Sequence, residues 1–363
     1  MQTYRAIGLM SGSSLDGLDI ACCNFTDTGN GYTFEITHAD VVTYPPEWVQ
    51  RIKCLTNANA QTVAEADAAL GHYFGEEVSA FITKHNIEGI DVVASHGHTL
   101  FHFPAQKYTT QIGDGAAIAA HVNLPVACNF RTADIANGGQ GTPIVPIGDL
   151  LLFNDYKLCL NMGGIANISC KTGTDSIVAF DICSANQVLN YFANQLGEEY
   201  DKGGAFAQAG EIDTELLKQL NQLAYYTKAY PKSLDNSFST YEILPLIDNA
   251  DTSIHSALRT YTEHIAIQIA LHIKAIATHE KLQLSKGDKM MVTGGGAFNT
   301  FLMERIQHHS LVTIVVPDEK IVTYKEALVI ALMGVLRLRN QVNVLKSVTG
   351  ATKNTIGGAV YMP

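Results

Sequence analysis

The same order of elements is predicted twice along the chain, and this repeat limits the possible folds more than any other feature of the sequence. In the first half, apolar runs predict strands over Tyr4–Met10 and Leu18–Phe25, joined by the polar turn Ser11–Gly17. Alternation at period two predicts a third strand over Phe34–Tyr44, and helices alternate with strands after it.

The second half repeats this order with different residues. Strands over Tyr156–Asn161 and Asn167–Cys170 flank the glycine turn Met162–Ala166, and a third strand over Ser176–Phe180 ends at Asp181. The other predicted elements are strands at Asp91–Ser95, Pro125–Asn129 and Lys289–Thr293, a strand end with a helix at Gln111–Ala120, and helices at Val63–Phe81, Gln187–Leu196, Ile212–Tyr225, Thr262–Thr278 and Lys325–Arg337. This order predicts an α/β protein with two similar domains.

The length agrees with two domains, because 363 residues at roughly 150 per domain give about two. The chain is 47% hydrophobic, which is enough for large cores. We place the domain boundary where the first copy of the repeated order of elements ends. The N-terminal domain is predicted to comprise residues 1–135 together with a C-terminal helix from about residue 340, and the second domain residues 136–340.

The charge balance bears on the partners of the chain. There are 24 Lys and Arg residues against 35 Asp and Glu residues, a formal net charge of −11. Nucleic-acid binding through the phosphate backbone needs clustered Lys and Arg, so we expect no nucleic-acid partner. A small phosphorylated ligand remains compatible with this charge, because backbone N–H groups and a metal ion can hold it.

The chain is expected to be cytoplasmic. Its first residues lack the pattern of a signal peptide, and no run of about 18 apolar residues predicts a membrane span. The seven cysteines are an odd number without a CxxC pair, which favours reduced thiols. The apolar helix expected over Thr262–Thr278 could serve a homodimer interface as well as a core, so a homodimer stays open.

The first glycine turn, Ser11–Gly17, could hold an anion. Glycines let backbone N–H groups approach a phosphate without a Cβ in the way, and three serines add hydroxyl donors. Asp16 could hold Mg²⁺ directly or through water. Taken alone, the segment is better explained as a serine-rich hairpin loop.

Two further glycine turns follow apolar strands. One is Asn161–Gly164, and the other is Gly294–Gly296, which opens a helix where a nucleotide could lie at the helix N-terminus. The sequence contains neither a P-loop motif nor a strand-placed GxGxxG. Each turn alone could be purely structural, but three of them, two at equivalent points of a repeat, indicate a nucleotide site.

Asp181 and a group of histidines are the other candidates. Asp181 follows a strand, at the place where side chains of α/β domains reach a ligand, although it could instead cap the next helix. His96, His98 and His102 match no standard metal spacing, and hydrogen bonding in a pocket or to the backbone is the better interpretation.

Ten segments together carry a resemblance to a known family. They are Gly8–Gly17; Ser95–Thr99 with His102 and Pro104; Gln111–Asp114; Arg131–Ala136 with Gly138–Gly141; Asn161–Asn167; Phe180–Asp181; Tyr200–Asp201; Gly203–Gly204; Gly294–Gly296; and Glu326–Ala327. In this order they resemble the anhydro-N-acetylmuramic acid kinases, over nearly the whole chain. The resemblance implies the sugar-kinase, actin and heat-shock chaperone superfamily, with two ribonuclease-H-like domains around a central nucleotide cleft.

The resemblance also implies a reaction and roles for residues. The family uses ATP and water to open the 1,6-anhydro ring of anhydro-N-acetylmuramic acid and phosphorylates O6, giving N-acetylmuramic acid 6-phosphate for cell-wall recycling. Asp181 resembles the general base that activates water. The remaining implied contacts are the first phosphate loop (Gly12, Ser13, Ser14, Leu15, Asp16, Gly17 and Asp19, with Asp16 near Mg²⁺), the second (Gly163 and Gly164), the adenosine-side turn (Gly294, Gly295 and Gly296) and the sugar contacts (Thr99, Arg131, Asp134 and Glu326).

The chain departs from the family pattern after its Phe-Asp pair. Ile182–Ala185 stands where the family has Thr-Gly-Pro-Gly, while Asp181 and Asn186 keep their spacing. Two other hypotheses remain. One is a kinase of the same fold that phosphorylates a free sugar hydroxyl, with Asp181 deprotonating that hydroxyl. The other is a nucleotide-gated binding protein, which would need a binding region for which the chain has no spare domain.

Overall fold

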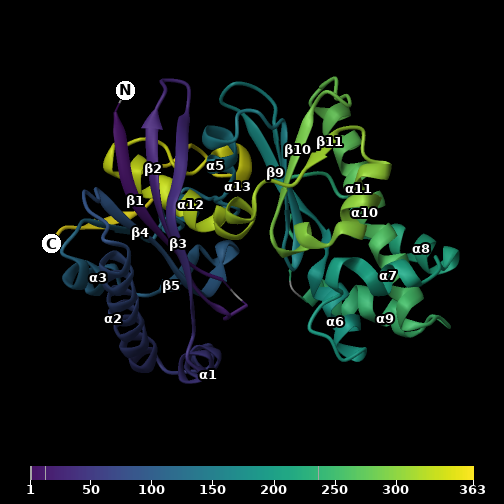
Figure 1. The fold of residues 1–363 in the computed structure, drawn as a ribbon, viewed down its shortest axis with the longest axis horizontal. Coiled ribbons are helices and arrows are strands. Elements are labelled where there is room, and N and C mark those ends of the chain that lie inside the picture. Colours follow the sequence, from purple (N-terminus) through teal and green to yellow (C-terminus); the bar gives the residue numbers. More distant parts are fainter. Residues whose placement is uncertain (1, 13, 236) are drawn as a thin grey trace. The chain divides into compact units, whose positions relative to one another are not determined.

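The computed structural model describes residues 2–12, 14–235 and 237–363. The chain forms two compact units (Figure 1): unit 1 is Met1–Asn154 with Tyr324–Pro363, and unit 2 is Asp155–Thr323. Each unit has its own sheet and its own helices.

Unit 1 is built on a mixed seven-stranded sheet. Its strand order is β12-β6-β4-β1-β2-β3, and β5 pairs with β4. The strands are β1 (Thr3–Ser11), β2 (Gly17–Asp27), β3 (Tyr32–Thr43), β4 (Val92–Phe103), β5 (Tyr108–Ile112), β6 (Val126–Cys128) and β12 (Ala359–Tyr361). Because β1, β4 and β6 are parallel, their carboxyl ends lie at one edge of the sheet.

Helices cover this sheet because β1 is apolar on both faces. The helices of unit 1 are α1 (Pro46–Leu55), α2 (Ala60–His85), α3 (Gly115–Val122), α4 (Thr132–Ala136), α5 (Pro146–Leu152), α13 (Lys346–Thr349) and most of α12 (Glu319–Leu338). Ile7 and Leu9 belong to a core with Leu70 and Phe74 of α2. Between them, Gly8 faces α12 so closely that a Cβ would collide with the Ala327 carbonyl.

The division into units differs from the predicted boundary at 135/136. Residues 136–154 belong to unit 1, where α5 contacts β3. Asp149 of α5 also pairs with Lys325 of α12 at 2.7 Å, with each side chain only 5% exposed. The chain returns to unit 1 earlier than predicted, at Tyr324 within α12, and the residues after 340, with α13 and β12, belong to unit 1 as expected. Apolar spacing alone cannot show which sheet a helix covers.

Unit 2 has a five-stranded sheet of order β11-β10-β7-β8-β9. The strands are β7 (Leu158–Met162), β8 (Ile165–Lys171), β9 (Ile177–Ser184), β10 (Lys289–Thr293) and β11 (Thr313–Val315). Strand β10 is parallel to β7, and β9 also runs in that direction because two antiparallel pairings separate β9 from β7. The carboxyl ends of β7, β9 and β10 therefore lie at one edge.

The helix α10 (Ile254–His279) packs across this sheet, and its apolar face, with Ile265, Ile269 and Ile273, is fully buried in the core of unit 2. The face that could have served a homodimer is thus used inside the unit. The other helices of unit 2 are α6 (Asn186–Gln195), α7 (Ala205–Ala209), α8 (Thr214–Asn221), α9 (Leu244–Asp248) and α11 (Thr300–His309).

Most of the predicted elements are confirmed, and two differences concern the candidate site. The predicted strand that ends at Asp181 continues to Ser184, so Asp181 lies within β9. The turn at Gly294–Gly296 does not open a helix directly: a short 3-10 turn, Gly295–Phe298, comes before α11. Helix α1 follows Pro45 and was not predicted.

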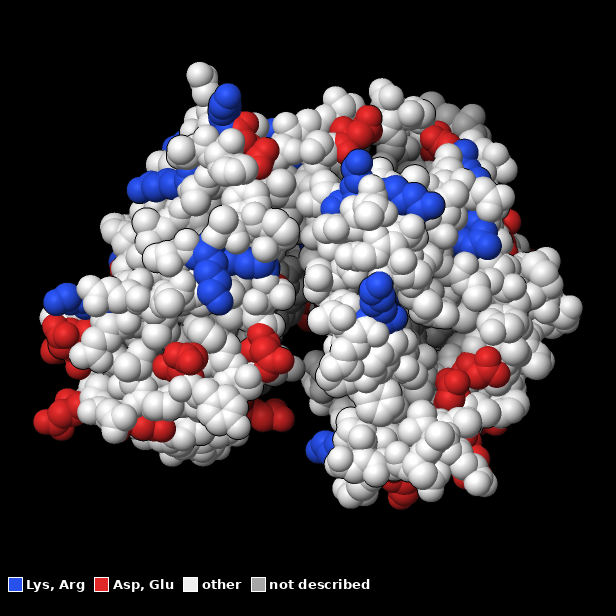
Figure 2. All heavy atoms as spheres, turned by 180° about the vertical axis from the view of Figure 1, so that it is seen from behind, with Lys and Arg blue, Asp and Glu red and all other residues white. Residues whose placement is uncertain are grey.

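Figure 2 shows one face of the molecule, on which Lys and Arg side chains occur singly or in small groups among acidic and uncharged ones. This face therefore carries no continuous basic strip. This agrees with the net charge of −11. Among the described residues, no helix combines the length and apolar character that crossing a membrane requires.

Candidate active site

Two of the three predicted glycine turns lie next to each other in unit 2. Gly163 and Gly164 follow β7, and Gly294 follows β10, at adjacent carboxyl ends. Gly294 has φ +82°, and a Cβ on it would collide with Asn161 and Met162. Only glycine allows this backbone conformation and this close approach. The contact keeps the two turns together.

Asp181 belongs to a row of polar residues that crosses the sheet beside these turns. The register pairs Asp181 with Asn167, Asn167 with Asn161, and Asn161 with Thr293. Neighbours in such a row project from the same face of a sheet. The sheet thus places a carboxylate, two amides and a hydroxyl next to the two glycine turns.

Burial raises the pKa of Asp181 above its usual value, and a hydrogen bond of 2.9 Å from the Leu234 N–H to Oδ2 opposes that rise. The backbone of Asp181 is held as well: the Tyr225 hydroxyl donates to its carbonyl at 2.7 Å, and its N–H donates to the Lys232 carbonyl at 3.2 Å. A partly buried carboxylate with a raised pKa is suited to accept a proton near neutral pH.

The segment that departs from the family pattern is integrated into this region. Ile182, Cys183 and Ser184 continue β9 where the family pattern has a glycine–proline turn, Ala185 follows directly, and all four residues are fully buried. The Ala185 N–H donates to the Gly164 carbonyl at 2.7 Å. The segment Ile182–Ala185 therefore connects the end of β9 to the second glycine turn.

A pocket of about 410 Å³ opens beside the third glycine turn. Gly295 and Gly296 line it, together with Asn186 of α6, the Tyr200–Gly203 loop, Phe298 and Asn299. Tyr200 and Phe298 are 56% and 49% exposed, so two aromatic rings stand at the surface of the pocket. Their flat faces suit a planar heterocycle.

In unit 1, the first glycine turn reverses the chain between β1 and β2. Leu15 adopts a left-handed conformation with φ +58°, and Ser14 donates to Asp16 at 2.7 Å. At the base of the turn, Ser11 accepts a hydrogen bond from Tyr44 at 2.7 Å and pairs with His98 at 3.0 Å. Ser13, another predicted phosphate contact, lies outside the described residues.

Acidic side chains gather near this turn. Burial, followed by the negative charges of Asp16 and Glu326, raises the pKa of Asp19 to about 7. Burial also raises the pKa of Glu326, while the cations of Arg131 and Lys325 oppose this. Three neighbouring carboxylates repel one another, and a divalent cation would relieve that repulsion. This charge pattern suits Mg²⁺, which is usually held by one or two carboxylates and waters.

Arg131 follows β6 and is oriented by His96. Its Nε and Nη2 donate to His96 Nε2 at 3.0 and 2.9 Å, and Nη1 donates to the Gly141 carbonyl at 2.6 Å. Burial, and after it the nearby Arg131, lower the pKa of His96 to about 3, so this histidine is a neutral acceptor. Thr99 accepts a 3.4 Å hydrogen bond from Gln111.

The histidine hypothesis is confirmed for hydrogen bonding, since His96 also pairs with the Gly97 carbonyl and His102 pairs with Thr109. Among the described residues, no cluster of three metal-ligating side chains occurs.

The structure assigns Asp134 a different place from the predicted sugar contact. Its side chain is fully buried and accepts hydrogen bonds from the Gly141 N–H and the Thr349 hydroxyl, each at 2.8 Å. Asp134 thus orders the turn that precedes Gly141, on which Arg131 also depends. The position of Asp134 three residues after Arg131 does not show from the sequence that its side chain is buried.

Sequence reasoning did not identify several residues that complete these arrangements. Asn161 and Asn167 were recognised only as parts of a motif, although the register places them in the Asp181 row. Tyr225 was predicted only as the last residue of a helix, and Lys232 and Leu234 come from a segment without apolar periodicity, so no pattern connected these residues to Asp181.

Comparisons with known proteins identify the family of this chain. The sequence model of the family described as anhydro-N-acetylmuramic acid kinase matches residues 4–363. The anhydro-N-acetylmuramic acid kinase of Aliivibrio fischeri is 33% identical over 99% of this chain and 99% of its own length. That of Saccharophagus degradans is 31% identical over the full length of each chain.

The matches to solved structures are weaker in both TM-score and sequence identity. The activator of the 2-hydroxyisocaproyl-CoA dehydratase from Clostridium difficile with bound ADPNP has a TM-score of 0.44 and 12% identity, covering 93% of this chain and 96% of its own. A hexokinase from Schistosoma mansoni complexed with glucose has a TM-score of 0.39 and 9% identity, covering 91% and 85%. The sequence relationship is decisive: this chain belongs to the anhydro-N-acetylmuramic acid kinase family.

Proposed function

We propose that this protein uses ATP and water to convert anhydro-N-acetylmuramic acid into N-acetylmuramic acid 6-phosphate, a step of cell-wall recycling in the cytoplasm. The proposal rests on one observation above the others. Asp181, a carboxylate whose pKa is raised by burial, lies in the same cross-sheet row as Asn161 and Thr293, which lie beside the second phosphate turn and the adenosine-side turn.

Asp181 acts as the general base. It accepts a proton from water while the water oxygen bonds to the anomeric carbon, and the bond from that carbon to the bridging oxygen breaks. The released oxygen is O6, which bonds to the γ-phosphorus of ATP as ADP leaves. Capture of O6 by phosphorus makes it a better leaving group, so each step assists the other.

The glycine turns hold the phosphates of ATP. Phosphoryl transfer depends mainly on positioning and on neutralising charge, and backbone N–H groups supply both without a lysine. We assign this role to Gly163–Gly164 in unit 2 and to Gly12–Gly17 with Asp19 in unit 1. Asp16 and the neighbouring acidic side chains would hold Mg²⁺, which would supply positive charge to the phosphates.

The sugar contacts of the proposal are Thr99, Arg131 and Glu326. Arg131 suits the carboxylate of the sugar, because His96 and Gly141 fix its planar guanidinium in one orientation. Asp134 is left out of the direct contacts, because its two oxygens serve the Gly141 turn.

The test is a product assay with ATP and Mg²⁺ on two substrates, the anhydro sugar and free N-acetylmuramic acid, read by mass spectrometry. The anhydro sugar is expected to gain one phosphate and one water. Phosphorylation of the free sugar alone would replace the proposal with a kinase acting on a hydroxyl. The absence of phosphate transfer to either sugar would refute both enzyme hypotheses.

We expect Phe298→Ala to weaken ATP binding about tenfold, because loss of one stacking ring costs roughly 1–3 kcal/mol. Phe298 lines the pocket beside Gly295 and is half exposed, so its removal leaves the core of unit 2 intact. Isothermal titration with a non-hydrolysable ATP analogue measures the effect. Tyr241→Ala is the matched control, since Tyr241 is 75% exposed and is not one of the residues that line this pocket. Equal ATP affinities in the two variants would contradict the assignment of this pocket to adenine.

A further inference from the structure

Asp181 is held mainly by one irregular segment of unit 2. Within Tyr225–Leu234, three groups contact Asp181: the Tyr225 hydroxyl, the Lys232 carbonyl and the Leu234 N–H. Residues 228–235 have neither helical nor strand conformation. The position of the Asp181 carboxylate therefore depends on whatever anchors this segment.

Lys232 anchors the end of the segment that contacts Asp181, while Tyr226 and Tyr230 anchor its middle. Its ammonium donates to His272 Nε2 at 2.8 Å and to the Tyr225 carbonyl at 3.2 Å. It also lies 4.5 Å from the ring centre of Tyr225 and 5.8 Å from that of Phe180, which is the residue before Asp181. A long flexible side chain is thus held at several points in a partly buried place.

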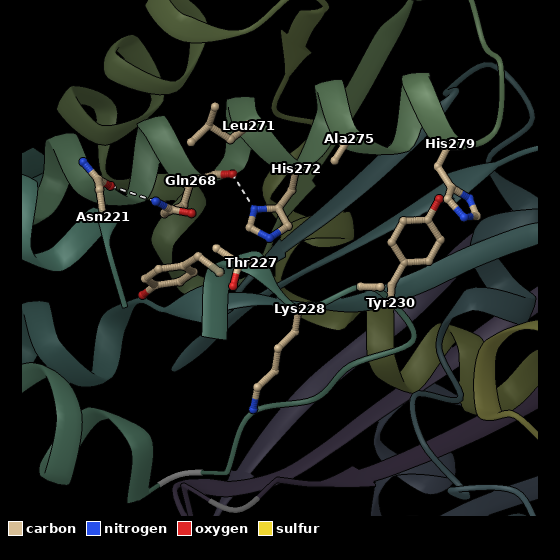
Figure 3. A pocket seen from close by; sticks show the side chains of 11 residues that line it. Asn221, Thr227, Lys228, Tyr230, Gln268, Leu271, His272, Ala275 and His279 are labelled. Carbon is tan, nitrogen blue, oxygen red and sulfur yellow. Dashed lines mark hydrogen bonds between the residues drawn. The ribbon is translucent and has the colours of Figure 1, made fainter. Parts of the chain in front are cut away.

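His272 of α10 is prepared to receive this ammonium. It is 6% exposed, and its Nδ1 donates to the Gln268 carbonyl at 2.7 Å, which leaves Nε2 as an acceptor (Figure 3). Burial lowers the pKa of His272 to about 4, so the ring is neutral when the lysine approaches. Since α10 crosses the sheet of unit 2 as a rigid helix, the pair ties the irregular segment to the core.

Other side chains also tie this segment to unit 2. A cavity of about 410 Å³ lies between residues 226–230 and α10, and His272, Gln268 and Tyr230 line it (Figure 3). Tyr226 pairs with His264 of α10 at 2.9 Å, and the Tyr230 ring stacks on Phe180 at 4.8 Å. The link between Lys232 and His272 adds a contact at residue 232, next to the two backbone groups that contact Asp181.

We propose that Lys232 is a positioning residue for Asp181, acting through His272 to fix the Lys232–Leu234 backbone that orients the base. The proposal rests on the assignment of Asp181 as general base. Lys232 acts through geometry, because its ammonium bonds to His272 and Tyr225 while its backbone carbonyl contacts Asp181. Without the link, the Leu234 N–H would no longer hold Oδ2.

The test compares Lys232→Met with Lys228→Met in the full chain. Methionine keeps most of the aliphatic length and removes the donors. Lys228 is the matched control, because it is exposed, lies on the same segment and points away from α10 in Figure 3. A displacement of about 1 Å at a reacting group can cost 10²-fold in rate, so Lys232→Met is expected to lower kcat 10- to 100-fold. The KM for ATP should stay within twofold.

Two readouts separate positioning from a general loss of structure. The acid limb of the kcat profile should move to higher pH in Lys232→Met, because the lost Leu234 hydrogen bond no longer favours the ionised Asp181. His272→Gln, which keeps an acceptor, should retain more activity than His272→Leu. An unshifted acid limb, or equal losses in the Lys228 and Lys232 variants, would overturn the proposal.

Hydrogen–deuterium exchange tests the link without any substrate. The amides of residues 228–235 should exchange faster in Lys232→Met than in the wild type, while the α10 amides keep their protection. If the wild type fails to phosphorylate the anhydro sugar, the proposed function fails and this measurement still decides the anchoring. Unchanged exchange in the segment would show that Lys232 does not anchor it.

Discussion

Asp181→Asn is expected to lower kcat by about 10²- to 10⁴-fold, the range that general-base catalysis contributes. The amide keeps the size of the side chain, and its oxygen can still accept the Leu234 hydrogen bond. It cannot take a proton from water. ATP affinity should remain within a few-fold, because the glycine turns and not Asp181 bind the phosphates. Steady-state kinetics and titration with an ATP analogue measure the two effects.

Asp175→Asn is the matched control for this experiment. Asp175 is exposed in the turn before β9, so its substitution removes a carboxylate near the same strand without touching the polar row. Its kcat should equal that of the wild type. Full activity in Asp181→Asn would contradict the assignment of the base, whatever the control shows.

The raised pKa of Asp181 also predicts the shape of the pH profile. The base must be ionised to accept a proton, so kcat should rise with pH through the pKa of Asp181. Burial places that pKa above the ordinary value of 3.8. The acid limb should therefore lie above pH 3.8, and a profile that stays flat below this value would show that another group accepts the proton.

Features that depend on local pattern could be predicted from the sequence. The strands before the glycine turns are confirmed, since apolar runs followed by glycine mark them directly. The resemblance assigned Asp181 as the base on the Phe-Asp pair. The register explains why that residue lies near the turns, since Asp181 is separated from Asn161 by only one strand.

Features that depend on tertiary contacts could not be predicted. Arg131 carries a charge that suggested a ligand, but its orientation comes from His96, which is 35 residues earlier in the chain. Asp134 was interpreted as a sugar contact, and its partner Thr349 is 215 residues away. Neither hydrogen bond could be predicted from the sequence, because each joins residues far apart in the chain and a single contact of this kind produces no periodic pattern.

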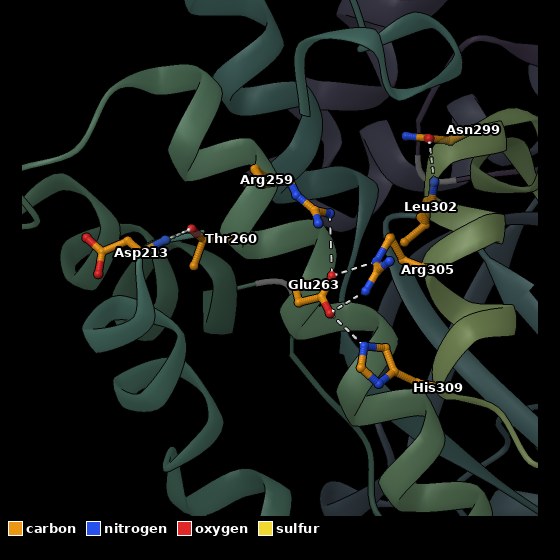
Figure 4. Close-up of polar contacts among 8 residues, drawn as sticks. All are labelled: Asp213, Arg259, Thr260, Glu263, Asn299, Leu302, Arg305 and His309. Atoms are coloured by element: carbon orange, nitrogen blue, oxygen red, sulfur yellow. Dashed lines mark hydrogen bonds and ion pairs between the residues drawn. The ribbon is translucent and has the colours of Figure 1, made fainter. Parts of the chain in front are cut away.

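The largest expected effect on stability comes from Glu263 of α10 (Figure 4). Its side chain is 6% exposed and pairs with Arg305 of α11 at 2.8 and 2.9 Å, with His309 at 2.6 Å and with Arg259 at 3.4 Å. Glu263→Ala leaves Arg259, Arg305 and His309 without their shared partner, and breaking such a buried pair costs about 3–5 kcal/mol. Since 1 kcal/mol shifts Tm by roughly 2–4 °C in a unit of this size, we expect a drop of about 6–20 °C in calorimetry.

Glu304→Ala is the control, because Glu304 is exposed on α11 and its loss should change stability by no more than about 0.5 kcal/mol. A Tm of Glu263→Ala within 2 °C of the control would contradict a stabilising role of the cluster.

The same cluster predicts how stability depends on pH. Burial raises the pKa of Glu263, but the hydrogen bonds and charges of Arg305 and His309 outweigh this, so the net pKa is lowered. A group with a lowered native pKa stabilises the fold above its unfolded pKa, here 4.5, and loses that contribution as the pH falls through the native value. The difference in Tm between wild type and Glu263→Ala should thus be full at pH 7 and shrink below pH 4.5. A constant Tm difference from pH 7 to pH 3 would show that Glu263 acts through packing and not through its charge.

Glu263 also bears on the pocket beside the third glycine turn. It pairs with Arg305 of α11, and Asn299, just before α11, lines that pocket. Glu263→Ala should therefore also bind the ATP analogue more weakly at temperatures near its Tm.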